Sequence, residues 1–142
     1  MKIAIGGDHA AYQLKEKLIA YLKEKKHIVK DFGTHSEESC DYPDIAHPLA
    51  ESISKGEHDF GIAICGSGNG INITVNKHQN IRSALCWNSE LAALARKHND
   101  ANILALPARF INVETAIECI DEFLSNDFEG GRHQIRVNKI KI

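Results

Sequence analysis

The chain has 142 residues, of which 43% are hydrophobic and 25% are charged, as expected for one domain with its own core. A net charge of −2 argues against broad nucleic-acid binding, which needs a basic face. No apolar stretch approaches the roughly 20 residues of a membrane span, and residues 1–8 are apolar too briefly for a secretory signal. We therefore expect a single cytoplasmic domain over residues 1–142 with no membrane segment.

Apolar runs typical of strands alternate with helical patterns along the chain. We expect strands at 2–6, 28–32, 60–64, 81–86 and 102–106. We expect helices at 10–26, 43–55, 69–78, 88–98 and 113–125, because apolar residues recur there at helical spacing. This alternation predicts an α/β fold, a three-layer α/β/α Rossmann-like sandwich around a five-stranded parallel sheet. The basic tail at 129–142 fits no further repeat of the pattern.

Polar residues that could bind a ligand follow three of the predicted strands. Asp8 and His9 follow the first strand, Cys65 ends the third, and Arg109 follows the fifth. Ligands of parallel sheets bind beyond the carboxyl ends of the strands, so these residues predict a site at that edge. The simpler interpretation of Asp8 is a helix N-cap.

The segment that begins at Cys65 is the most informative part of the sequence. It continues with Gly66, Ser67, Gly68, Asn69 and Gly70, and a predicted helix follows. A helix N-terminus favours the thiolate form of a nearby cysteine, and bare backbone N–H groups can hold a small anion or a developing oxyanion. A cysteine at the end of a strand is usually a core residue, but the open glycine loop favours a chemical role.

Three known phosphate-binding loops do not match this segment. A Walker loop needs Gly-Lys-Ser/Thr, whereas Gly70 is followed by Ile71 and Asn72. A dinucleotide-binding loop needs the spacing G-x-G-x-x-G, whereas these glycines alternate. A cysteine phosphatase needs an arginine at the position of Ile71. The remaining interpretation is a short cradle of N–H groups for a small anion.

Other polar residues have both a functional and a structural interpretation. His98 could transfer a proton near neutral pH, or it could simply favour the negative end of a helix capped by Asn99. Arg109, Arg132 and Arg136 could bind a phosphate or could form a solvated basic surface. Arg132 and Arg136 lie four residues apart, so on a helix they would share a face. The histidines show no close metal-ligand spacing, and we expect no metal site.

Several motifs together resemble one family over nearly the whole chain. They are Gly6-x-Asp8-His9, Asp41-Tyr42-Pro43, Ile64-Cys65-Gly66-Ser67-Gly68-x-Gly70, Asn76-Lys77, Ile81-Arg82, Arg96-x-His98-Asn99-Asp100 and Glu129-Gly130-Gly131-Arg132-His133-Gln134-x-x-Arg136-Val137. These motifs resemble the B-type ribose-5-phosphate isomerases. Their wider group of sugar-phosphate isomerases includes galactose-6-phosphate and allose-6-phosphate isomerases.

The resemblance implies interconversion of D-ribose 5-phosphate and D-ribulose 5-phosphate in the pentose phosphate pathway, without a metal or cofactor. It implies that Cys65 is the base for C1 and C2, that Ser67 helps to stabilise the enediolate, and that His98 opens the furanose ring. The implied substrate-binding residues are Asp8, His9, Tyr42, Gly66, Gly68, Asn69, Gly70, Asn99, Arg109, Arg132 and Arg136. It also implies a homodimer or a dimer of dimers with sites at the subunit interface, and a phosphate-binding role for 129–142.

Two positions depart from the usual family pattern. Pro107 stands where glycine is frequent, which could change the approach of Arg109, and Ser67 stands where threonine is also common. One alternative function is an isomerase of a hexose 6-phosphate, allose or galactose. The complete Gly-Gly-Arg-His-Gln tail and His-Asn-Asp run favour the pentose. A second alternative is a sugar-phosphate sensor without activity, and the presence of both Cys65 and His98 argues against it.

Overall fold

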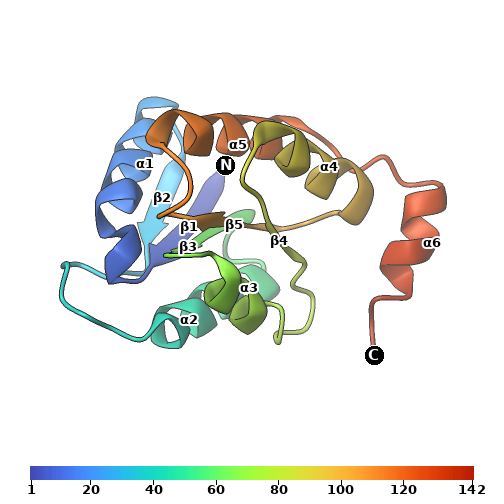
Figure 1. Cartoon of the computed structure of the whole chain (residues 1–142). Coiled ribbons are helices and arrows are strands. Elements are labelled where there is room, and N and C mark those ends of the chain that lie inside the picture. The colour runs from blue at the N-terminus through green and yellow to red at the C-terminus, as the bar shows by residue number, and fades with distance from the viewer.

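The computed structural model describes residues 1–142 and confirms the predicted α/β architecture. Five parallel strands form one sheet in the order β2-β1-β3-β5-β4 (Figure 1). The strands are β1 (Lys2–Gly7), β2 (Ile28–Asp31), β3 (Phe60–Cys65), β4 (Ser83–Leu85) and β5 (Ile103–Pro107). The central strands β1, β3 and β5 are almost fully buried, which explains their unbroken apolar sequences.

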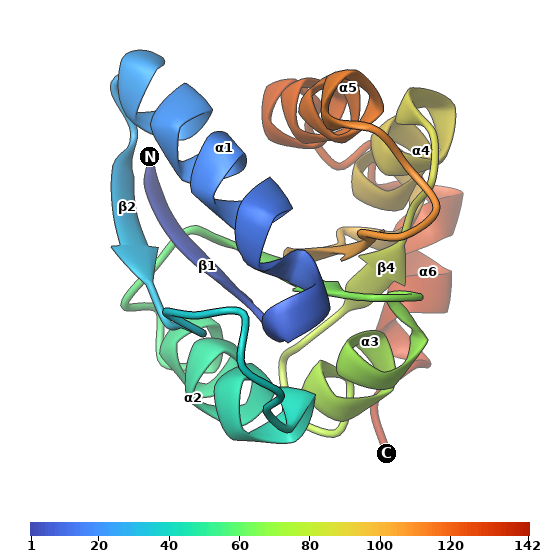
Figure 2. The same cartoon turned by 60° about the vertical axis from the view of Figure 1, so that its left-hand side comes forward.

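Helices cover both faces of the sheet (Figure 2). One layer contains α1 (Tyr12–Glu24), α4 (Ser89–Asn99) and α5 (Val113–Ser125), and the other contains α2 (Tyr42–Ser54) and α3 (Asn69–Val75). A short 3-10 turn, η1 (His9–Ala11), precedes α1. The tail forms α6 (Arg132–Asn138), which lies outside the two layers against α4. Arg132 and Arg136 therefore lie on one short helix, where their spacing of four residues places them on the same face.

Alternating side chains of β3 supply both halves of the core. Ile62 and Ile64 point into the apolar cluster beneath α1, α4 and α5, whereas Ala63 and Cys65 belong to the cluster beneath α2 and α3. Phe123 of α5 is 1% exposed, and burial of such a side chain contributes about 1.5–3 kcal/mol. Cys86 and Cys119 lie in the first cluster, where a free cysteine packs as a small apolar residue.

Several elements are shorter than the sequence pattern suggested, with α3 and β4 differing for an identifiable reason. We expected a helix at 69–78 and a strand at 81–86, but α3 ends at Val75 and β4 spans only Ser83–Leu85. The reason is a clamp by the side-chain amide of Asn76. This amide donates to the carbonyl oxygen of Ser83 at 3.0 Å and accepts from its N–H at 2.9 Å. The clamp turns the chain after α3 and fixes the start of β4.

No helix in the structure is long and apolar enough to span a bilayer.

Candidate active site

The sheet order places three of the predicted site segments side by side. Because β1, β3 and β5 are neighbours, their carboxyl ends meet at one edge of the sheet. The N–H of Asp8 donates to the carbonyl oxygen of Ile64 at 3.2 Å, and the N–H of Arg109 donates to that of Gly66 at 3.0 Å. The structure thus joins the Asp8, Cys65 and Arg109 segments through their backbones.

Cys65 is the last residue of β3 and lies opposite Pro107 in the sheet register. It is only 4% exposed and shares its apolar cluster with Ala46 and Ile71, against which Tyr42 also packs. The thiol therefore lies at the predicted strand end, directly before the glycine loop. Within a single chain it is covered by the α2–α3 layer.

Close neighbours explain the glycines of the loop. Gly68 is the N-cap of α3 with φ of 75°, and a Cβ there would come within 2.4 Å of Leu85 Cδ1. A Cβ at Gly70 would lie 2.4 Å from Cζ of Tyr42, and one at Gly66 would lie 3.1 Å from Nη1 of Arg109. The loop is consequently flanked by the phenol ring of Tyr42 and the guanidinium group of Arg109.

The exposed part of the loop borders a surface hollow of about 420 Å³. Its lining residues are Ser67, Asn69, Leu85, Trp87, Pro107 and Phe110. The hydroxyl oxygen of Ser67 accepts from the N–H of Asn69 at 3.3 Å, which holds the serine side chain over the turn. Cys65 does not line this hollow, because its side chain is buried in the cluster beneath α2 and α3.

Asp8 and His9 lie at the end of β1, next to this loop. Asp8 caps the 3-10 turn, because its Oδ1 accepts from the N–H of Ala10 at 3.0 Å, which confirms the capping interpretation. Nδ1 of half-buried His9 accepts from the N–H of Cys40 at 3.2 Å. A neutral His9 then carries its ring proton on Nε2, where it can donate to an anion.

Arg109 stays beside the loop despite the departure at Pro107. Proline is the last residue of β5, beyond the last pair of this strand with β4 at Ala105, so only the end of the strand lacks an N–H. The following turn then returns the exposed Arg109 to Gly66.

The other predicted site residues lie at the opposite edge of the sheet. Helix α4 starts beyond the carboxyl end of β4 and runs back, so His98 and Asn99 lie near the amino end of β5. The four steps between the first and last residues of β5 separate the two edges by about 13 Å, at about 3.3 Å per step. The N–H of Glu129 donates to the carbonyl oxygen of Lys97 at 3.0 Å, which ties the C-terminal segment to the end of α4. The exposed Arg132 and Arg136 of that segment therefore lie at the same edge as His98.

The end of α4 differs in detail from the expected Asn99 cap. Asp100, with φ of 48°, occupies the left-handed position, and Asn99 is the last helical residue. Two arginines hold the Asp100 carboxylate, Arg82 at 2.8 Å and Arg96 at 3.0 Å. These ion pairs explain why the aspartate takes the turn position, which Asp and Asn both tolerate.

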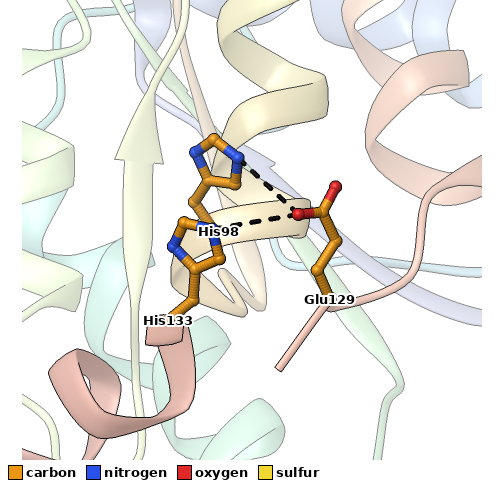
Figure 3. A group of neighbouring side chains, drawn as sticks. All are labelled: His98, Glu129 and His133. Atoms are coloured by element: carbon orange, nitrogen blue, oxygen red, sulfur yellow. Dashed lines mark ion pairs between the residues drawn. The ribbon is translucent and has the colours of Figure 1, made fainter. Parts of the chain in front are cut away.

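Sequence reasoning missed two residues beside His98. Glu129 and His133 approach it in the structure (Figure 3), and the three donor atoms lie within 4.8 Å of one another. The His98 and His133 rings are stacked at 4.1 Å and 9°. Parallel rings at this separation cannot both direct an in-plane nitrogen lone pair at one metal ion, so metal binding would require one ring to rotate. Glu129 and His133 are four residues apart, but nothing in the sequence links them to His98.

Comparison with known proteins decides the family. The family model described as "Ribose/Galactose Isomerase" matches residues 3–140. The chain belongs to this family. The ribose-5-phosphate isomerase B of Escherichia coli is 45% identical over 139 residues, which is 98% of this chain and 93% of the relative.

Solved structures of other ribose/galactose isomerases have the same fold. The enzyme from Clostridium thermocellum, a ribose-5-phosphate isomerase B, is 50% identical with a TM-score of 0.97 over 99% of this chain and 95% of its own. That from Mycoplasma genitalium, with bound ribulose-5-phosphate, is 40% identical with a TM-score of 0.95 over 98% of this chain and 93% of its own.

Proposed function

We propose that this protein interconverts D-ribose 5-phosphate and D-ribulose 5-phosphate by moving a proton between C1 and C2 through an enediolate. Its family membership and the relatives named ribose-5-phosphate isomerase B support the reaction. The structural observation that carries the mechanism is the Cys65 thiol at the end of β3, directly before the glycine loop.

Cys65 is the proposed base. An aldose–ketose isomerisation removes a proton next to a carbonyl group, so it needs a base at the carbon and donors at the oxygen that becomes negative. The N–H groups of residues 66–71 and the Ser67 hydroxyl are the donors in our proposal. Asp8, Tyr42 and Asn99 would orient the sugar hydroxyls.

The phosphate of the substrate does not react, and its binding energy serves to position the sugar. His9 and Arg109 would hold the phosphate from the carboxyl edge, together with Arg132 and Arg136 of the 129–142 segment. Guanidinium groups match phosphate oxygens in pairs.

The two groups of residues require a second copy of the chain. Cys65 and His98 lie at opposite edges of one sheet, so one site can hold both only if a partner contributes His98, Asn99, Arg132 and Arg136. Exposed apolar side chains beside the loop support such a contact, since Trp87 is 55% and Phe110 is 74% exposed. We therefore propose a homodimer, or a dimer of dimers, with sites at the interface.

The alternative substrate is a hexose 6-phosphate, because the family model covers both ribose and galactose isomerases. Turnover of ribose 5-phosphate should exceed that of allose 6-phosphate and galactose 6-phosphate in a direct comparison. The opposite preference would assign the protein to the hexose branch.

The Cys65→Ala variant tests the proposed mechanism. We expect isomerisation to fall by at least about 10²-fold, the usual contribution of a general base, while a phosphate-bearing competitor still binds. Cys119→Ala is the matched control, because this thiol is buried in the other core cluster and its loss should leave turnover unchanged. Full activity of Cys65→Ala would remove the thiol from the mechanism.

The proposed reaction needs no metal or cofactor and takes place in the cytoplasm. All four cysteines are free thiols, which suits a reducing compartment. A coupled assay on ribose 5-phosphate should give the same rate with and without a chelator, and loss of activity on chelation would contradict this.

A further inference from the structure

Three side chains form a small cluster at the end of α4. Nε2 of His98 lies 3.9 Å from Oε2 of Glu129, and Nε2 of His133 lies 3.8 Å from the same oxygen (Figure 3). The two rings are stacked with their planes only 9° apart. Both imidazoles thus face a single carboxylate oxygen, and one ring covers a face of the other.

The cluster has a fixed side and an open side. The His133 side chain is 11% exposed, whereas that of His98 is 36% exposed. His133 is anchored in α6, where its N–H bonds to the carbonyl oxygen of Gly130 at 3.0 Å, and Glu129 is tied to Lys97 through its own N–H. The buried His133 ring is therefore the fixed surface against which the more accessible His98 ring packs.

The surroundings of His133 disfavour the charged form of its imidazole. Burial lowers the pKa of His133, and neighbouring His98, Arg132 and Arg136 lower it further, against the opposing effect of Glu129. These effects favour the neutral form of the His133 ring. A neutral His133 leaves the negative charge of Glu129 to act on His98.

We propose that Glu129 and His133 are positioning residues for His98, with His133 setting the plane of its ring and Glu129 orienting its proton. This inference rests on the proposed function, in which His98 opens the sugar ring. It assigns a task to two residues that the proposed mechanism does not otherwise use.

Ring opening explains why the orientation matters. In furanose ribose 5-phosphate the C1–O4 bond must break while O4 gains a proton and the C1 hydroxyl loses one, leaving an aldehyde at C1 and a hydroxyl at C4. A proton donor held at O4 speeds this step. Ribulose 5-phosphate has no such ring, because its O5, which would close one, carries the phosphate. Loss of His98 function therefore slows the ribose substrate at ring opening, before the proton moves between C1 and C2.

His133→Ala, His133→Phe and Glu129→Gln test the proposal, with Glu118→Gln of α5 as a matched surface control. We expect kcat on ribose 5-phosphate to fall about tenfold in His133→Ala and Glu129→Gln, a part of the 10²–10⁴ that a proton donor supplies. NMR can follow the rate at which ribulose 5-phosphate loses its C1 protons in D₂O. In these variants that rate should change less than about twofold, because proton abstraction needs only the base. His133→Phe, which keeps a flat ring under His98, should retain most of the activity.

Three results would overturn the positioning role. Equal losses of activity with both substrates would indicate general structural damage. A raised KM with unchanged kcat would indicate direct substrate binding. Unchanged kinetics would show that the cluster has no role in turnover. An unmodified protein that is inactive on both sugars would instead refute the proposed function. Failure of the positioning role and failure of the proposed function therefore give different results.

Discussion

Single residues link the glycine loop to the sheet. Gly68 combines a left-handed φ of 75° with a position where a Cβ would come within 2.4 Å of Leu85 and 3.2 Å of the backbone carbon of Leu106. The first constraint is conformational and the second is steric, so a larger residue would be strained and would need the Leu85 side chain to shift and the β5 backbone to give slightly. The loop geometry at Cys65 therefore depends on this glycine.

Gly68→Ala should lower the free energy of unfolding by about 2–5 kcal/mol, because left-handed strain of about 1–2 kcal/mol adds to overpacking of about 1–3 kcal/mol. Gly56→Ala is the control, since Gly56 has φ of 74° but a Cβ added there would meet no atom within 4 Å, and it should show the strain alone. Urea denaturation of both variants measures the difference. Equal losses would mean that Leu85 moves aside freely.

At the scale of elements, α4 and α6 form the second half of the proposed site. Helix α6 is held by its two buried residues, His133 and Val137, and by the backbone bond between Glu129 and Lys97. Arg132 and Arg136 remain exposed. The helix is thus attached by one side and leaves its basic side chains available to a ligand.

Arg136→Ala should raise the KM for ribose 5-phosphate by about tenfold or more, because a hydrogen bond to a charged group contributes about 1.5–3 kcal/mol. The melting temperature should stay within about 1 °C, since the lost side chain is on the surface. Lys139→Ala, at the end of the same helix, should leave both values unchanged. Steady-state kinetics and thermal melting check the prediction, and an unaltered KM in Arg136→Ala would remove this arginine from the phosphate site.

At the scale of the whole molecule, the two edges of the sheet carry the two halves of the proposed site. A two-fold dimer would bring the carboxyl edge of one chain to the His98 group of its partner, and would form two identical sites. In such a dimer each site would take Cys65 and His98 from different chains, so two inactive variants could complement each other.

Cys65→Ala and His98→Ala proteins should each be inactive, but unfolding and refolding them together in equal amounts should restore about a quarter of the wild-type activity. Half of the dimers would be mixed, and one of the two sites in each would have both residues intact. Activity assays before and after mixing test this. No recovery in correctly assembled mixtures would place both residues in one chain.

Global stability should also depend on pH through His27. Burial lowers the pKa of this imidazole below its ordinary 6.5, with a smaller contribution from the N-terminal amine and an opposing one from Asp121. The unfolded chain therefore takes up a proton at higher pH than the folded chain does. The stabilisation is fully present above pH 6.5 and is lost as the pH falls.

Urea denaturation between pH 7.5 and pH 5 should show this loss, and His27→Gln should reduce the slope. The buried Nδ1 of His27 has no hydrogen-bond partner, so glutamine need not break a native bond. An identical slope in the variant would assign the pH dependence to other groups, such as His133, whose pKa is also lowered by burial.

The sequence by itself determined the fold class and the carboxyl-edge half of the site. Apolar periodicity is a local property, so the strands, the helices and their alternation could be predicted. Because parallel strands end at a common edge, Asp8, Cys65 and Arg109 could be grouped before their contacts were known. The roles of His98 and the tail arginines came from the family resemblance.

Only the tertiary structure decided how distant segments meet. It set the strand order, covered Cys65 with the α2–α3 layer, and placed His98 at the opposite sheet edge, stacked on His133. These outcomes depend on packing between segments far apart in the chain, which local periodicity does not encode. The clamp at Asn76 and the turn at Asp100 likewise depend on partners supplied by other elements.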